Sequence, residues 1–152
     1  MKSEHPYTAI LASALVAGTI LEAWMLVSFT LILRIFSPLE VLQWDASNVL
    51  GNAAYAQGFG SAAVGVVMHY LVSLVWATLY VLLFAKQRIV DMHPLINGAL
   101  FGVIVWFIMT FIILSIGVGT HIEVNALSIL TGIFANVVCF GMPLAYVVRR
   151  LE

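Results

Sequence analysis

The sequence predicts an all-α polytopic membrane protein, with four transmembrane helices and one short amphipathic helix at the membrane interface. Hydrophobic residues make up 63% of the chain and charged residues only 9%, and the mean hydropathy is +1.11. A soluble domain carries about 25% charged residues. The apolar residues also form four runs of roughly 20 residues, the length that crosses a hydrocarbon layer of about 30 Å. We therefore expect the lipid bilayer to be the main partner of this chain.

The four expected spans lie within a single domain that covers residues 1–152. They are residues 8–36, 61–85, 94–116 and 126–148. The first run is too long for the core of a signal peptide, which has about 7–15 residues, so we expect a retained helix.

The basic residues predict how the chain is oriented. Lysine and arginine close to span ends resist translocation. All but Arg34 fall on one side of a four-span arrangement, namely Lys2, Lys86, Arg88, Arg149 and Arg150. We therefore expect both termini to be cytoplasmic.

A capping box predicts the short helix over residues 38–50. In the segment SPLE, Ser37 can cap the helix, Glu40 can return the hydrogen bond, and proline occupies the first helical position. Gly51 can end the helix. At 1.5 Å per residue the helix reaches only about 20 Å, too short to cross the membrane.

The short helix is expected to lie along the outer surface of the membrane, where Trp44 suits the interface. Its apolar face comprises Leu39, Leu42, Ala46 and Val49, and its wettable side comprises Gln43, Ser47 and Asn48. We favour a membrane anchor over a lid that covers a cavity.

Four polar or amphipathic residues fall at the same predicted depth in the membrane, one on each span. They are Glu22, His69, Trp106 and Asn136. An ionised carboxylate near the bilayer centre costs about 2.5–3.5 kcal/mol on insertion scales, so Glu22 should be protonated, paired or hydrated. His69 is the natural partner. Two interpretations stay open: the layer is hydrogen-bonding contact between helices, or it is a proton or cation site.

Small residues spaced by four accompany this polar layer and predict close helix packing. The glycines of these stripes are Gly18, Gly65, Gly98, Gly102 and Gly132. We expect these faces to meet at the centre of the bundle.

A second polar cluster is predicted at the outer face, from residues of two loops. It comprises Glu40, Asp45, His121 and Glu123. Imidazole and carboxylate groups suit divalent cations, but the spacing has no metal-binding signature. These residues are better explained as ordinary polar side chains of solvent-exposed loops. The sequence therefore predicts no metal and no other cofactor.

Two segments carry a resemblance to a known group of proteins. The sequences HYLVSLVWATLY, which begins at His69, and GALFGVIVWFIM, which begins at Gly98, resemble uncharacterised bacterial four-helix membrane proteins such as the YagU-like group. The resemblance implies location in the bacterial inner membrane and a link to acid tolerance. It implies no catalytic residues.

The sequence leads us to expect a non-enzymatic accessory or scaffold subunit that self-associates or packs on a larger membrane partner. Little of the chain lies outside the spans, and no GxSxG or HExxH motif is present. The net charge of −1 indicates no basic surface that would bind nucleic acid. One alternative is a small proton-coupled transporter or channel that uses Glu22 and His69. A second is a membrane subunit that binds haem or quinone.

Overall fold

The computed structural model contains four long helices. It describes residues 6–85, 93–113, 116, 118 and 123–151. Four segments are long and apolar enough to cross a membrane, and they run over Pro6–Ile32, Gly58–Ala85, Pro94–Ile112 and Ala126–Leu151. The prediction of four apolar helices is therefore confirmed.

Each long helix has a π-helical segment. The first comprises α1 (Pro6–Val27) and η1 (Ser28–Ile32), and the second α3 (Gly58–Tyr80) and η3 (Val81–Ala85). The third comprises α4 (Pro94–Ile108) and η4 (Met109–Ile113), and the fourth α6 (Ala126–Phe134), η5 (Ala135–Gly141) and α7 (Met142–Leu151).

Local sequence explains several helix ends. The first helix ends at Ile32, earlier than the predicted residue 36, because Arg34 adopts a positive φ of 55° that the helix does not accommodate. α4 begins at Pro94, and the side chain of His93 accepts a hydrogen bond from the Leu95 amide. α6 begins with a capping box between Asn125 and Ser128.

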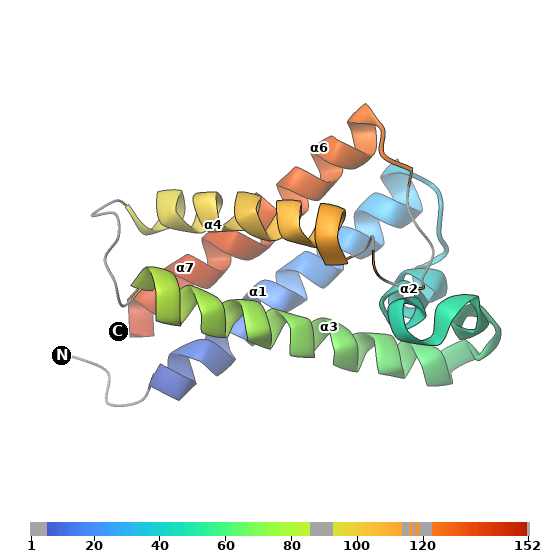
Figure 1. Cartoon of the computed structure of the whole chain (residues 1–152), viewed down its shortest axis with the longest axis horizontal. Helices are drawn as coiled ribbons and strands as arrows, with labels where there is room; N and C mark the ends of the chain where they lie inside the picture. The colour runs from blue at the N-terminus through green and yellow to red at the C-terminus, as the bar shows by residue number, and fades with distance from the viewer. Residues whose placement is uncertain (1–5, 86–92, 114–115, 117, 119–122, 152) are drawn as a thin grey trace.

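α1 lies between the second long helix and the fourth, and the third long helix packs on the fourth (Figure 1). α3 packs against α1, and α4 packs against α7 and η5. α1 also contacts α7 and η5. The start of α1 and the end of α7 lie at one end of the bundle, whereas α2 lies at the opposite end of α3 (Figure 1).

Glycines allow two helices of this bundle to touch along their backbones. A Cβ at Gly98 would overlap the Gly141 carbonyl, and a Cβ at Gly102 would overlap the Asn136 carbonyl. α4 therefore lies directly against η5, which is the close approach that small residues permit between membrane helices.

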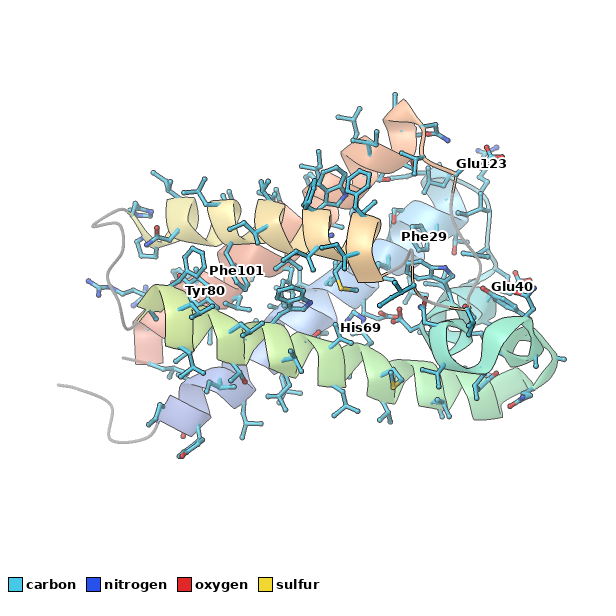
Figure 2. The ribbon with its side chains drawn as sticks, in the orientation of Figure 1. Phe29, Glu40, His69, Tyr80, Phe101 and Glu123 are labelled. Atoms are coloured by element: carbon cyan, nitrogen blue, oxygen red, sulfur yellow. The ribbon has the colours of Figure 1, made fainter. Side chains whose placement is uncertain are left out.

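An aromatic cluster joins α3 to α4 at the end of the bundle where α1 begins. Tyr80 and Phe101 face one another across the two helices, with ring centroids 5.1 Å apart (Figure 2). Phe84 packs on the same Phe101 ring at 5.2 Å. Tyr80 and Phe101 are almost fully buried, so this end of the bundle is closed by packed side chains.

The short helix α2 (Pro38–Leu50) forms with the predicted bounds and the predicted capping box between Ser37 and Glu40. Its orientation differs from the prediction. The residues expected to face water, Gln43 and Ser47, are buried, whereas Val49 is exposed. Trp44 is also buried, against Phe29 of η1. Gln43 finds its partners in the segment that follows α2, whereas the Ser47 hydroxyl donates to the Trp44 carbonyl of its own helix.

Gln43 and Ser61 bind the connection between α2 and α3. The Nε2 of Gln43 donates to the Gly58 carbonyl at 2.9 Å and to the Ser61 hydroxyl at 3.1 Å. Ser61 in turn donates to the carbonyl of Ala54, within the 3₁₀ helix Gly51–Ala56. These hydrogen bonds hold the connection in place.

Gly65 determines how closely α2 can approach α3, because a Cβ there would overlap the Leu42 carbonyl. We expect Gly65→Ala to lower the free energy of unfolding in detergent micelles by about 1–3 kcal/mol, the usual cost of overpacking. Gly60→Ala is the matched control, since a Cβ at Gly60 meets open space in the same helix. Denaturant unfolding followed by circular dichroism measures both variants. Equal stability of the two would contradict this packing.

Candidate functional site: a histidine between two carboxylates

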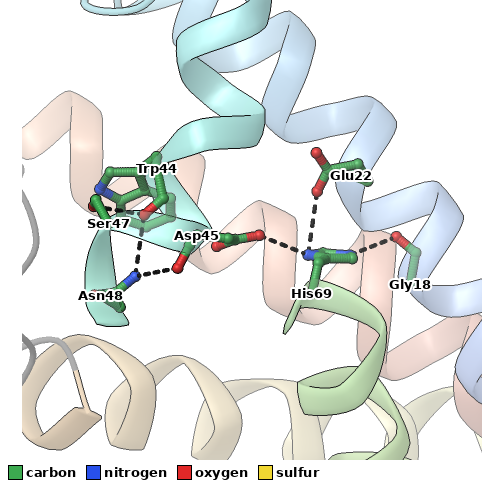
Figure 3. Close-up of polar contacts among 7 residues, drawn as sticks. All are labelled: Gly18, Glu22, Trp44, Asp45, Ser47, Asn48 and His69. Atoms are coloured by element: carbon green, nitrogen blue, oxygen red, sulfur yellow. Dashed lines mark hydrogen bonds and ion pairs between the residues drawn. The ribbon is translucent and has the colours of Figure 1, made fainter. Parts of the chain in front are cut away.

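Three ionisable side chains from three helices meet at one nitrogen atom. His69 of α3 directs its Nδ1 at Glu22 of α1 and at Asp45 of α2 (Figure 3). Nδ1 lies 3.1 Å from Oε2 of Glu22 and 3.2 Å from Oδ2 of Asp45. We call these three residues the His69 cluster.

Helix geometry explains why Glu22 and His69 are at the same height. Glu22 lies ten residues before Ile32, and His69 lies eleven residues after Gly58. At 1.5 Å per residue, both side chains are therefore about 15–17 Å from the same end of the bundle. Asp45 reaches them because Gly65, one turn before His69, lets α2 lie against α3.

The ring of His69 is held on its other side by the backbone of α1. Its Nε2 lies 2.9 Å from the Gly18 carbonyl oxygen. A carbonyl oxygen can only accept, so Nε2 carries a hydrogen and donates it. The imidazole ring is thereby fixed in one orientation and one tautomer.

This orientation sets the least number of protons that the cluster can hold. A neutral ring with its hydrogen on Nε2 presents a bare lone pair at Nδ1. That lone pair would face two carboxylate oxygens, which also carry lone pairs. At least one further proton must therefore lie on Nδ1 or on a carboxyl oxygen. With no such proton the cluster has a charge of −2, and it becomes neutral only after taking up two.

No basic side chain offsets this charge within the described part of the chain. The arginines there are Arg34, Arg149 and Arg150, and no ion pair joins any of them to Glu22 or Asp45. The side chains of the cluster are also little exposed, at 6% for His69, 13% for Glu22 and 19% for Asp45. An uncompensated charge in such surroundings is costly.

One oxygen of the cluster lacks a hydrogen bond. Oε2 of Glu22 is buried and accepts no hydrogen bond from the described residues. Nδ1 of His69 lies 3.1 Å away, but the contact does not count as a hydrogen bond. A single N–H on Nδ1 cannot serve two carboxylates equally well, which leaves this oxygen unsatisfied.

The cluster borders a large cavity. The cavity has a volume of about 660 Å³, and both His69 and Asp45 line it. The remaining walls are mostly apolar, with Trp44, Trp76 and Trp106 among them. A mainly apolar cavity with a few polar groups is typical of a binding site.

Asn136 and Trp106 share the cavity but do not join the cluster. Both line its walls. The side-chain amide of Asn136 donates to the Gly132 carbonyl on its own helix at 3.0 Å, rather than to Glu22. The indole of Trp106 lies over Gly132, where a Cβ would come within 2.8 Å of its Nε1. The predicted layer of four is therefore divided between the cluster and another wall of the cavity.

Two members of the predicted outer-face cluster, Glu40 and Asp45, have other partners. Glu40 caps α2: its carboxylate accepts a hydrogen bond from the Ser37 amide at 2.8 Å. This bond and the Ser37 hydroxyl hold the pKa of Glu40 below its ordinary value. Glu123 is exposed, and His121 lies outside the described residues. Asp45 is directed inward to His69.

Asp45 is the member of the site that the sequence did not identify. The sequence places it in an outer loop helix, far from His69 in the chain. The available signal was Gly65, which falls one turn before His69 in a stripe of small residues. Such a stripe permits close approach of another helix, but it does not say which helix approaches.

Comparison of the chain with protein-family models, with curated proteins and with solved structures finds no match. The resemblance to the YagU-like group stays a prediction.

Proposed function

We propose that the four helices cross the inner membrane of a bacterium with both termini in the cytoplasm. The exposed side chains along the long helices support insertion, since large apolar residues such as Leu15, Val67 and Phe107 face outward. Arg149 and Arg150 lie at the end of the bundle opposite α2, which supports the orientation.

Orientation is tested with single cysteines in a Cys139→Ala background. We expect a membrane-impermeant maleimide to label Ala53→Cys in intact spheroplasts, because Ala53 is exposed in the 3₁₀ helix that follows α2. Leu151→Cys, exposed at the other end, should be labelled only after lysis. Labelling of Leu151→Cys in intact spheroplasts, with Ala53→Cys protected, would reverse the orientation.

We further propose that the protein is a small proton-coupled carrier, in which the His69 cluster takes up and releases protons. The observation that supports this most is the meeting of Glu22, Asp45 and His69 without a basic partner among the described residues. Acid and imidazole groups at this depth are costly to keep charged, so changes in proton number are the natural response of the cluster.

The cavity and the closed end of the bundle favour a carrier over an open channel. The cavity reaches Asp45 and His69 and so provides access to the cluster. Beyond the cluster, Tyr80 and Phe101 pack α3 against α4. Passage of a proton to that end requires these helices to separate, which is a conformational step of the kind that carriers use.

The same packing weakens the case for a scaffold subunit. Small-residue stripes such as that of Gly98 and Gly102 would favour such a subunit if they were free to contact another protein. Both glycines are buried against η5 and Gly141 of the same chain. They are therefore already used inside the bundle.

Proton flux into liposomes tests the carrier. Purified protein is reconstituted with a pH-sensitive dye inside, and a potassium diffusion potential drives protons inward in buffers that contain a chelator. We expect wild-type flux above that of protein-free liposomes. Glu22→Gln should lower it to the protein-free level, because the amide cannot take up a proton.

Glu123→Gln is the matched control, since Glu123 is an exposed carboxylate outside the cluster. It should conduct like the wild type. The carrier would be refuted if Glu22→Gln left the proton flux unchanged. It would also be refuted if the wild-type flux did not exceed that of protein-free liposomes.

A further inference from the structure

We propose that the His69 cluster binds a divalent transition-metal ion, which replaces its protons. Nδ1 of His69, a carboxylate oxygen of Glu22 and a carboxylate oxygen of Asp45 would be the three protein ligands. The proposal concerns the same site as the proposed carrier and rests on that function only where it predicts inhibition of proton flux.

The distances between the candidate ligand atoms suit a metal ion. Metal-to-ligand distances of about 2.0–2.1 Å, as for zinc, separate neighbouring ligand atoms by about 2.8–3.4 Å in octahedral and tetrahedral geometry. Nδ1 lies 3.1 Å and 3.2 Å from the two carboxylate oxygens, and all three atoms lie within 4.8 Å of one another. A small shift of the carboxylates is enough to enclose an ion.

The backbone already holds the imidazole ring in the orientation that a metal ligand needs. A histidine that binds a metal usually donates its other N–H to a carbonyl or carboxylate group, which fixes its tautomer. In His69, Nε2 donates to the Gly18 carbonyl at 2.9 Å. The free nitrogen, Nδ1, is the one that faces both carboxylates.

Charge and hydrogen bonding also favour an ion. Without added protons the cluster carries −2, so one divalent cation makes it neutral. A cation would also contact Oε2 of Glu22, the buried oxygen that accepts no hydrogen bond from the described residues. A proton on Nδ1 satisfies one carboxylate well, whereas a metal ion contacts both.

The ligand types indicate which ions fit. One imidazole nitrogen and two carboxylate oxygens suit Zn²⁺, Mn²⁺, Co²⁺ or Fe²⁺, whereas Mg²⁺ and Ca²⁺ prefer oxygen ligands alone. Three protein ligands leave at least one coordination position open. His69 and Asp45 line the cavity, so that position is accessible to water or to a bound molecule there.

Metal and protons compete for the same atoms, which has two measurable consequences. Because the empty cluster holds at least one proton beyond the Nε2–H, binding of a metal must release protons. An ion in the cluster should also stop proton transfer through it.

Co²⁺ binding to chelator-treated protein in detergent tests the site directly. We expect one Co²⁺ per chain, with visible absorption that Zn²⁺ abolishes. Calorimetry of Zn²⁺ binding in two buffers of different ionisation enthalpy should report release of at least one proton per ion. Glu22→Gln and Asp45→Asn should each lower the affinity by at least about tenfold, and His69→Gln should abolish binding.

His93→Asn and Glu123→Gln are the matched controls, because both residues are exposed and outside the cluster. They should bind Co²⁺ like the wild type. Absence of stoichiometric binding in the folded wild type would overturn the proposal. Binding that persists in all three cluster variants would also overturn it, by placing the ion elsewhere.

X-ray absorption of the wild type with Zn²⁺ keeps the test independent of whether the variants fold. It should show one imidazole with oxygen ligands, and a sulfur ligand or several imidazoles would contradict the site.

Flux measurements separate the two proposals. If both hold, micromolar Zn²⁺ should reduce the wild-type proton flux to the level of protein-free liposomes. Stoichiometric binding with no flux at any metal concentration would refute the carrier and keep the metal site. Proton flux that Zn²⁺ leaves unchanged, in a protein that shows no stoichiometric metal binding, would refute the metal site and keep the carrier.

Discussion

The hydrogen bond from Nε2 of His69 to the Gly18 carbonyl is the constraint on which the site depends. It directs the other ring nitrogen at two carboxylates and excludes the tautomer that could donate to them without an added proton. The proton content of Glu22 and Asp45 is therefore coupled to the ring of His69. Burial strengthens this coupling, because electrostatic interactions are stronger away from water.

The packing of the helices supplies the surroundings of that ring. Gly65 allows α2 to lie on α3, which brings Asp45 to the cluster. At one end of the bundle, Tyr80 and Phe101 join α3 to α4. Toward α2 the same two helices are separated by a cavity, and the cluster forms part of its wall. The molecule thus combines a closed end with an accessible ionisable site, which is what uptake of protons or a cation from one side requires.

Much of the fold could be predicted from the sequence, because its signals are local. Apolar runs identify the four long helices, and the SPLE segment identifies both the start of α2 and its capping box. The end of the first helix was less accurate, since a single residue, Arg34, leaves the helical conformation.

Interactions between helices were predictable only in part. Counting residues from the ends of the spans predicted that Glu22 and His69 lie at the same depth. This was possible because the sequence shows where both spans end. It could not orient α2: an amphipathic pattern has the same form whether the polar side faces water or buried partners such as Ser61. The interpretation of Asp45 as an outer-face residue followed from that ambiguity.

Nitrogen NMR of His69 tests the central claim most directly. In metal-free protein labelled with ¹⁵N at histidine, and with the signal assigned by His69→Gln, we predict a hydrogen on Nε2 at every pH at which the fold persists. The Nδ1 signal should shift in both Glu22→Gln and Asp45→Asn. A neutral ring with its hydrogen on Nδ1 and a bare Nε2, or an Nδ1 signal that neither substitution moves, would contradict the account.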